Sequence, residues 1–525
     1  MNHYQTSVVI IGAGPAGLTL AHLLNSYQID CIVLEKLSNT MEEPRAIGID
    51  SETLRTLQAI DMIDTVGQDI CFDVRITDYV NAEGKLLFQF DTKGEQPYGF
   101  PVFNTFDQPG FDRTLATSLT ASQHVKVLFK HELIRFEQNG QGVTIFANDA
   151  DGEPLQISAQ YLVGCDGGRS TVRNQLGIEM TGNNNEFPWL VIDTIDNGFA
   201  NGVPSRFFCD PARPGMTIKK NGAQRRWEWM LMPGETPSDI LNEEVIHRLI
   251  APYTDPSQVD IYRKRVYNFS AIIAERWQEG RVFLAGDAAH MTPPFAGQGL
   301  NSGMRDVRNL SWKLAMTVSG YTAPTILDSY TEERWDHARE LIQFALDLGE
   351  QIQPIDPQKA AERDAFFFEL QKDENAIEDF MTGLAKSMLA RSLEKGIVMS
   401  PGENAINGQL LLQPALLDKA GDEVLLDDLL GKGFSIIGYN CDPAEQLDAN
   451  VLTHWTSLGT TTIAIGDSAH HDSWPRDHND TLAPLFQQGE QTMALIRPDK
   501  FCLAAFNAQT ASEVLQHAKE LLHVL

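Results

Sequence analysis

The stretch that decides the fold is SVVIIGAGPAGLTLAHLLNSYQIDCIVLEK, residues 7–36. Its apolar run from Val8 to Ile11 is typical of a buried parallel strand, the segment that follows is an apolar helix, and CIVLE is a second strand that ends at Glu35. Three glycines with the spacing GxGxxG lie between the first strand and the helix: Gly12, Gly14 and Gly17. Strand, glycine turn, helix, strand and acid follow in the order that predicts an α/β dinucleotide-binding unit.

Each position of this unit has a physical role. The first glycine permits a tight turn, the second lets a pyrophosphate approach the backbone, and the third lets helix and strand pack closely. The helix N-terminus presents free N–H groups to phosphates, and Glu35 would accept hydrogen bonds from a ribose. The expected adenosine end of the site comprises Gly12, Gly14, Pro15, Ala16, Gly17, Glu35 and Lys36. The motif by itself suits NAD and FAD equally.

A second glycine cluster separates these two cofactors. Residues 281–301, RVFLAGDAAHMTPPFAGQGLN, end a strand at Asp287 and run through a glycine-rich loop into an amphipathic helix. Bare amides at a helix N-terminus suit a delocalised anion, and a reduced flavin, negative across N1 and the C2 carbonyl, is such an anion. Asp287 would then bind the ribityl or phosphate-linking hydroxyls of FAD. The alternatives are an ordinary loop for Gly297 and Gly299 and a helix cap for Asp287.

Composition limits the partners. With 41 basic and 71 acidic residues the formal charge is −30, which argues against nucleic acid or an anionic membrane as a partner. At 525 residues we expect two or three domains. The six cysteines are far apart without CxxC or metal-ligand spacing, so we expect reduced thiols, no metal site and a cytoplasmic protein. The N-terminus has neither a basic signal-peptide region nor an unbroken apolar span.

Three stretches resemble the signatures of the group A FAD-dependent aromatic hydroxylases: GAGPAGL near the N-terminus, YLVGCDGGRSTVR at 161–173 and FLAGDAAHMTPPFAGQGLNSGMRD at 283–306. PRAIGIDSETLRTLQAIDMID, WEWMLMPGE and RVYNFSAIIAERW are especially similar to 3-(3-hydroxyphenyl)propionate hydroxylases. The resemblance covers the chain to about residue 350. Beyond it, LIRPDKFCLAAF is similar to the end of the thioredoxin-like tail in phenol-hydroxylase relatives.

The resemblance implies a Rossmann-like FAD-binding domain of the glutathione-reductase type, an interleaved β-sheet substrate domain and a thioredoxin-like C-terminal domain. The expected FAD-binding domain comprises residues 1–75, 108–180 and 276–345. The expected substrate domain comprises 76–107 and 181–275, and a helical linker at 346–395 leads to the C-terminal domain at 396–525. Because this last domain has no CxxC, we expect a structural or dimerising role for it rather than dithiol exchange.

The resemblance also implies cofactor contacts. Arg45, in PRAIGI, would lie along the pyrophosphate and the flavin edge, with a surface arginine as the alternative. Gln108 matches a polar position near the flavin. Asp166 belongs to a signature that serves both FAD and the nicotinamide, and Arg173 would support its loop. The flavin end would be held by Asp287, Pro294, Gly297, Gly299, Leu300 and Asn301.

The implied activity is hydroxylation of an aromatic ring. NADH or NADPH would dock transiently, since there is no second GxGxxG, and would reduce FAD; O2 would then give a flavin C4a-hydroperoxide that oxidises an electron-rich ring. No protein nucleophile is required. His290 is a candidate for acid–base work, although a structural hydrogen bond explains it better. Ile47 stands where some phenol hydroxylases carry an acid.

The expected substrate is a small phenolic acid resembling 3-(3-hydroxyphenyl)propionate, bound by a monomer or a homodimer. An indole, a quinolone or a polycyclic antibiotic is an alternative substrate. A flavin halogenase is a second alternative, because WEWMLMP nearly matches the WxWxIP motif of that class. A non-enzymatic FAD-binding partner protein is a third, which the intact flavin-end loop disfavours.

Candidate substrate contacts come from QRRWEWMLMP, residues 224–233. Alternation along a strand places the two tryptophans on one face and Arg226 and Glu228 on the other. The tryptophans suit a core better than a ring-stacking wall. One of the two arginines could hold a substrate carboxylate bidentately, against the alternative of an Arg226–Glu228 surface pair. The substrate candidates are Arg225, Arg226, Trp227, Trp229 and Pro293.

Overall fold

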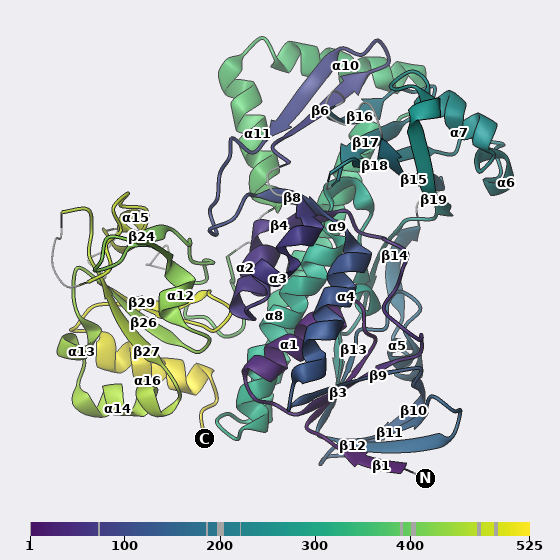
Figure 1. The fold of residues 1–525 in the computed structure, drawn as a ribbon. Coiled ribbons are helices and arrows are strands. Elements are labelled where there is room, and N and C mark those ends of the chain that lie inside the picture. The colour runs from purple at the N-terminus through teal and green to yellow at the C-terminus, as the bar shows by residue number, and fades with distance from the viewer. Residues whose placement is uncertain are drawn as a thin grey trace.

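The computed structural model describes residues 2–71, 74–184, 187–196, 204–220, 222–388, 392–400, 406–469, 474–487 and 492–525 (Figure 1). The unit predicted from the first glycine motif is present, as β2 (Val8–Ile11), α1 (Pro15–Ser26) and β3 (Cys31–Glu35). All of β2 is buried, as its apolar sequence predicts. The α/β character predicted from the sequence is therefore confirmed.

A six-stranded sheet forms the centre around this unit. Its order is β21-β22-β13-β2-β3-β9, in which five strands are parallel and the short β21 is antiparallel. The other strands are β9 (Val125–Phe129), β13 (Tyr161–Gly164), β21 (Gln278–Glu279) and β22 (Val282–Leu284). Helix α1 packs against α8 (Gly299–Val318) and α4 (Gln108–Ser118) (Figure 1). The carboxyl ends of β2, β3, β13 and β22 meet at one edge, where open α/β sheets bind ligands.

Three smaller sheets surround this centre. The first has the order β1-β12-β11-β10 and comprises Asn2–Gln5, Pro154–Ala159, Val143–Asn148 and Glu132–Gln138. The second is β4-β8-β5, with Gly48–Asp50, Phe103–Phe106 and Ile70–Cys71. The third is β14-β20-β23, with Met180–Asn184, Ser270–Ala274 and His290–Met291. Helices α2 (Ser51–Ala59) and α3 (Ile63–Val66) follow β4, and α5 (Thr171–Gln175) follows β13 of the central sheet.

A seven-stranded sheet, at the top of Figure 1, has the order β19-β15-β18-β17-β16-β6-β7. Its strands in chain order are Ile76–Asn81, Leu86–Asp91, Trp189–Asp196, Ser205–Cys209, Gly215–Lys219, Gln224–Met230 and Val259–Tyr267. One face packs on α6 (Pro237–Ile240) and α7 (Glu243–Ile250). The opposite face packs on α9 and α10 and is turned toward the central sheet.

Helix α9 (Ser329–Ile352) crosses the boundary that we expected between residues 345 and 346. It is one continuous helix, and its residues Ala345, Leu348 and Ile352 pack in the core beneath the seven-stranded sheet. Helices α10 (Pro357–Leu370) and α11 (Glu374–Met388) join the same core. The segment expected as a linker is thus part of a packed layer, because its apolar faces cover the sheet.

The C-terminal part of the chain, green to yellow at the left of Figure 1, has a four-stranded sheet of order β27-β26-β28-β29. β26 (Ser435–Tyr439) is parallel to β27 (Thr461–Ile465) and antiparallel to β28 (Met493–Ile496), which is antiparallel to β29 (Cys502–Phe506). β24 (Ala415–Leu417) and β25 (Glu423–Leu425) form a separate antiparallel pair. The helices are Leu426–Leu430, Pro443–Gln446, Ala449–Ser457, Ala483–Gln487 and Ala511–Leu521 (α12–α16).

Buried ion pairs join this C-terminal part to the central one. Arg497, after β28, binds Glu333 of α9 at 2.8 Å, and Lys313 of α8 binds the same carboxylate at 2.8 Å. Burial alone would raise the pKa of Glu333, but its two cations hold it well below its ordinary value. A second buried pair joins Arg55 of α2 to Asp427 of α12 at 2.7 Å. Separating the two parts would leave these charges unpaired, which is strongly destabilising.

Within the described ranges no helix combines the length and apolarity that crossing a membrane would require. The cysteines whose surroundings are described are free thiols: Cys31, Cys165, Cys209, Cys441 and Cys502. The side chain of Cys71 lies outside the described part of the chain. The described histidine, cysteine and acidic side chains form no group that could hold a metal ion.

Candidate active site

The first glycine loop shows why each glycine is needed. Gly12 has a φ of +104°, and a Cβ there would lie 2.4 Å from the carbonyl oxygen of Cys165. A Cβ on Gly17 would lie 2.0 Å from the carbonyl oxygen of Gly12, so α1 can approach β2 only because that position carries no side chain. The Cβ position of Gly14 has no described atom within 4 Å and borders a cavity. Gly12 and Gly17 therefore serve the turn and the packing, and Gly14 leaves room for a ligand.

Glu35 ends β3 beside this loop. Its Oε2 accepts a hydrogen bond from the backbone N–H of Ala13 at 2.9 Å, and its Oε1 accepts one from the N–H of Leu37 at 2.9 Å. These bonds fix the carboxylate at the cavity edge, and each oxygen retains a lone pair that can accept from a ribose hydroxyl. Lys36 lines the same end of the cavity.

A cavity of about 960 Å³ extends from this loop to the seven-stranded sheet. Ligand sites commonly measure roughly 300–1,000 Å³, so this one is large. Gly17 and Asn301 are the predicted cofactor residues that do not line it. Those that do are Gly12, Gly14, Pro15, Ala16, Glu35, Lys36, Arg45, Gln108, Asp166, Asp287, Pro294, Gly297, Gly299 and Leu300. The fold thus brings the two distant glycine clusters to one space.

The loop after β13 forms one side of the cavity. Asp166 accepts hydrogen bonds through Oδ2 from two backbone N–H groups at the start of α5, at 2.7 and 3.1 Å. Its Oδ1 is buried and has no partner among the described residues. A buried polar atom of this kind calls for a ligand or a water molecule. Arg173 ties the loop to the second glycine cluster, since it donates to the carbonyl oxygens of Gly168 at 2.8 Å and Ala288 at 2.9 Å.

The second glycine cluster forms the other side. Burial raises the pKa of Asp287, which lines the cavity, and the nearby Arg45 opposes this shift. Gly297 has a φ of +64°, and Gly299 is the first residue of α8. The nearest described atom to the Cβ position of Gly299 is the carbonyl oxygen of Thr292, at 3.8 Å. The start of α8 therefore offers bare backbone to the cavity, which suits the anionic ring expected there.

Two predicted residues turn away from the cavity. The Oδ1 of Asn301 accepts a hydrogen bond from Thr53 at 2.8 Å, and its Nδ2 donates to the carbonyl oxygen of Gly297 at 2.8 Å. The side chain of Asn301 thus braces the loop from behind, and a cofactor contact at Asn301 stays a prediction for its backbone N–H in the first turn of α8. His290 is buried, with Nε2 bonded to Asp306 at 2.7 Å. This is the structural hydrogen bond that the sequence favoured for His290 over acid–base work.

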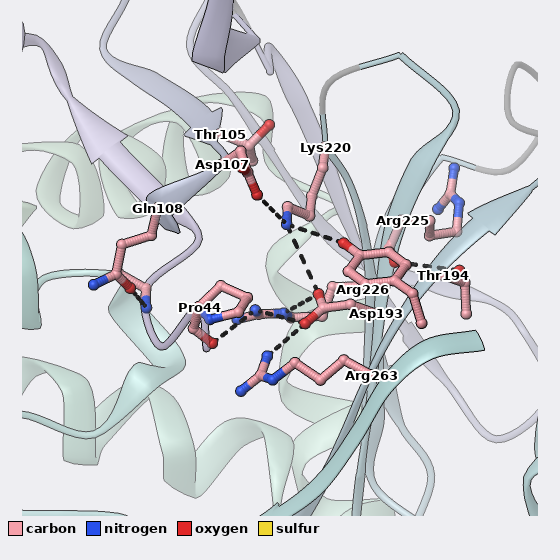
Figure 2. A network of polar contacts seen from close by, with 12 residues as sticks. Pro44, Thr105, Asp107, Gln108, Asp193, Thr194, Lys220, Arg225, Arg226 and Arg263 are labelled. Carbon is pink, nitrogen blue, oxygen red and sulfur yellow. Dashed lines mark hydrogen bonds and ion pairs between the residues drawn. The ribbon is translucent and has the colours of Figure 1, made fainter. Parts of the chain in front are cut away.

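The loop that carries Arg45 is held from two directions (Figure 2). Gln108, at the start of α4, accepts hydrogen bonds through Oε1 from the backbone N–H groups of Arg45 and Ala46, both at 2.8 Å. From the seven-stranded sheet, Arg226 donates to the carbonyl oxygens of Arg45 at 3.2 Å and Pro44 at 3.4 Å. The backbone of the loop is therefore fixed, while the exposed side chain of Arg45 lines the cavity.

Arg226 belongs to a buried ion network (Figure 2). Its Nε and Nη2 donate to Asp193 of β15 at 2.8 and 3.1 Å, and Asp193 also pairs with Arg263 and, at 4.0 Å, with Lys220. Burial alone would raise the pKa of Asp193, but its three cations lower it below its ordinary value. Asp193 already occupies the edge of the guanidinium that would bind a carboxylate bidentately. Arg226 is thus paired inside the protein, where the sequence suggested a substrate contact or a surface pair.

The remaining substrate candidates do not line the cavity: Arg225, Trp227, Trp229 and Pro293. The two tryptophans stack with ring centroids 5.8 Å apart and pack on α7 behind the sheet. They are core residues, as the alternation favoured, and Arg225 lies on their face of the strand. The residues of β18 that line the cavity are Arg226 and Glu228.

Comparisons with known proteins agree with this geometry. The FAD binding domain family matches residues 5–345, and the HcaD C-terminal domain family matches residues 408–521. The 3-(3-hydroxy-phenyl)propionate/3-hydroxycinnamic acid hydroxylase of Burkholderia cenocepacia (strain HI2424) is 35% identical, over 97% of this chain and 95% of its own. That of Klebsiella pneumoniae (strain 342) is 34% identical, over 97% and 93%. The chain belongs to the FAD-dependent aromatic hydroxylases. The membership predicted from the sequence motifs is confirmed.

Solved structures of FAD-dependent hydroxylases share this fold. The flavin-dependent monooxygenase PieE, in complex with FAD and substrate, has a TM-score of 0.82 at 21% identity and covers all of both chains. Aklavinone-11 hydroxylase, with FAD and aklavinone, has a TM-score of 0.79 at 23% identity over 99% of this chain and 100% of its own. The family match, the sequence relatives and the shared fold together identify this hydroxylase as an FAD-dependent aromatic monooxygenase, a class that uses NADH or NADPH and O2.

The cavity of this hydroxylase also contains residues that no motif marks. Asp112 lies one turn after Gln108 in α4 and is buried, and this burial raises its pKa well above the ordinary value. Glu228 lies in the sheet wall. Apolar lining residues from α9 and α11 are Phe344, Leu348 and Leu384. In the sequence, the four-residue spacing from Gln108 was the signal that could have placed Asp112 on the same face of a helix. The places of the other lining residues depend on how distant strands and helices pack.

Proposed function

We propose that this monooxygenase hydroxylates a phenolic acid of the 3-(3-hydroxyphenyl)propionate type. The observation that carries the proposal is the continuity of one cavity from the two glycine clusters to a wall of aromatic side chains. That wall contains Tyr79, Phe90, Phe103, Phe207, Phe269 and Phe295. The names of relatives about a third identical over nearly the whole chain support this substrate class.

The cofactor half of the cavity fits FAD. Gly14 leaves open space over the loop, Asp166 has an orphaned buried oxygen, and α8 begins with bare amides. Bound FAD supplies the redox chemistry, which is transfer of electrons from NAD(P)H to O2. In our assignment Glu35 binds the ribose, Arg45 the pyrophosphate and Asp287 the ribityl or phosphate-linking hydroxyls. The aromatic wall excludes water from the reacting ring.

Arg265 is the cation that we assign to the substrate carboxylate. It lies on the edge strand β19, lines the cavity and pairs with Glu43, with both side chains about half exposed. Such an exposed pair contributes little stability, so a substrate carboxylate can compete for the arginine. Arg265 and Glu228 both lie opposite Val191, on either side of it. Two strand spacings, about 10 Å, therefore separate Glu228 from Arg265. This separation is comparable with the distance between the ring hydroxyl and the carboxylate in this class of substrate.

The proposal includes the finer division of the fold. Five parallel strands in the order β22-β13-β2-β3-β9, next to the antiparallel β10, β11 and β12, support a glutathione-reductase-type domain. The parallel pair β26-β27 and the antiparallel β28 and β29 support a thioredoxin-like C-terminal domain. We propose the interleaved domain bounds expected from the sequence, changed only so that α9 is not divided. We further propose that the protein is cytoplasmic and is a monomer or a homodimer. Its formal charge of −30 supports the absence of a nucleic-acid partner.

The experiment is a substrate panel scored for stimulated NAD(P)H oxidation and for a mass gain of one oxygen. We expect 3-(3-hydroxyphenyl)propionate or 3-hydroxycinnamate to raise the oxidation rate about tenfold or more, because substrate-linked conformational steps gate such enzymes. One atom of labelled O2 should enter the product. Stimulation by an indole, a quinolone or a polycyclic compound alone would replace the substrate class, and a chloride-dependent product would indicate a halogenase.

The same panel tests Arg265. Arg265→Gln should raise the KM for a phenolic acid and leave the KM for an uncharged phenol unchanged, since only the acid loses its cation. Equal effects on both substrates would contradict the assignment of Arg265.

A further inference from the structure

Glu228 occupies the middle of the cavity wall. It lies on β18, and its cross-strand neighbours are Val191 of β15 and Met216 of β17. Beyond Met216 the same row continues with Phe207 and Tyr79. All five residues line the cavity, so a carboxyl group projects from an otherwise apolar and aromatic row.

The carboxyl group of Glu228 has no hydrogen-bond partner within the described part of the chain. The side chain is 6% exposed, and no described residue donates a hydrogen bond to it. Its nearest charge is Arg226 Nη1 at 3.8 Å, which is beyond hydrogen-bond distance. Arg226 is already bonded to Asp193 at 2.8 and 3.1 Å. A buried acid without a donor is costly, and a ligand that donates a hydrogen bond would relieve that cost.

We propose that Glu228 is a catalytic residue that binds the ring hydroxyl of the substrate and takes its proton during oxygen transfer. This inference rests on the proposed function, because a phenolic substrate supplies the donor. The O–H bond breaks, the proton goes to a carboxylate oxygen of Glu228, and the electron pair stays on the ring oxygen, where it activates the ring. The attacked carbon then gives up its hydrogen as a proton to water, the electron pair of this C–H bond makes the ring aromatic again, and Glu228 returns its proton to the ring oxygen.

The electrostatic surroundings suit this role. Burial raises the pKa of Glu228 to about 7, with Arg226 opposing the rise, Asp193 adding to it and Arg263 opposing it. A general base works best when its pKa lies near the working pH. The acid that some phenol hydroxylases carry in the Arg45 loop is replaced by Ile47, so the sheet would supply the group that this loop lacks.

The first test compares Glu228→Gln with a matched control. Asp78→Asn makes the same change on β6, where Asp78 pairs with Arg206 at 3.0 Å and does not line the cavity. With wild-type holoenzyme, hydroxylation of 3-(3-hydroxyphenyl)propionate should rise with pH through an apparent pKa near 7, because the ionised form is the base. Glu228→Gln should lose this rise of the rate with pH (the pH limb). Its hydroxylation rate should fall about a hundredfold, as is typical when a general base is removed. Asp78→Asn should keep both the limb and the rate.

A second measurement separates proton removal from positioning. A ring-fluorinated analogue whose hydroxyl is already ionised at the assay pH should restore much of the rate of Glu228→Gln, since no base is then needed. FAD content and unfolding temperature, measured in parallel, show that each variant is folded. A Glu228→Gln enzyme that keeps the pH limb, or that gains nothing from the fluorinated analogue, overturns the role of Glu228. A wild-type enzyme that hydroxylates no phenolic acid refutes the proposed function itself.

Discussion

Gly14→Val tests where the pyrophosphate of FAD lies. The backbone of Gly14 is extended, with φ −83° and ψ −179°, and its Cβ position has no described atom within 4 Å, so valine fits the apoprotein. The loss of a good N-cap residue should cost no more than about 1 kcal/mol of unfolding free energy. With FAD, the side chain would occupy the space over the loop. Loss of charge-assisted hydrogen bonds worth about 1.5–3 kcal/mol should weaken FAD binding about tenfold to a hundredfold.

Gly17→Ala is the matched contrast. Its Cβ would lie 2.0 Å from the carbonyl oxygen of Gly12, so helix and strand must separate, and overpacking of this kind costs about 1–3 kcal/mol or more. Calorimetry of the two apoproteins should show a large fall in unfolding temperature for Gly17→Ala alone. Titration with FAD, followed by quenching of its fluorescence, gives the dissociation constants. If folded Gly14→Val binds FAD as tightly as the parent, the pyrophosphate does not cross the loop at Gly14.

Three further changes test other parts of the hydroxylase. Asp287→Ala should weaken FAD binding about tenfold to a hundredfold, because a carboxylate bonded to cofactor hydroxyls is worth about 1.5–3 kcal/mol; equal retention of FAD through extensive dialysis would contradict this. Burial raises the pKa of Glu228 from an ordinary 4.5 to about 7, so the wild type loses stability as the pH rises across this interval. Without substrate, the unfolding free energy of Glu228→Gln near pH 8 should therefore exceed that of the wild type by up to about 3 kcal/mol. This difference should vanish near pH 4. Arg497→Met should lower the unfolding free energy by about 3–5 kcal/mol, because Glu333 and Asp499 lose their shared cation. An unchanged denaturation midpoint would show that the two carboxylates are not held by this arginine.

The parts of the site that could be predicted from sequence are those in which function constrains consecutive residues. The roles of Gly12, Gly14 and Gly17 follow from backbone geometry within one turn, and the structure gives each glycine the space or contact that its role requires. Glu35 could be placed because the length of α1 fixes where the next parallel strand ends. Local geometry of this kind depends little on the rest of the fold.

The polar wall of the substrate half could not be predicted, because it depends on strand register. Arg226 is typical of a carboxylate-binding residue in sequence, but the register of β15 and β18 places it opposite Asp193, which binds it instead. The same register isolates Glu228 between two apolar neighbours. The hydrogen bond between the Asn301 side chain and Thr53 of α2 likewise depends on how distant segments pack. The spacing of residues along the chain does not predict any of these contacts.

The ion pairs that dock the C-terminal part also couple it to the cofactor site. Lys313 lies in the helix whose first residue, Gly299, borders the flavin end of the site, and Glu333 lies in the next helix. Arg497, in the C-terminal part, binds the same Glu333 carboxylate as Lys313 does. Glu333 therefore has both of its cations only while the C-terminal part is docked. Undocking of the C-terminal part would unbalance the charge beside α8 and so destabilise the helix that borders the flavin end of the site.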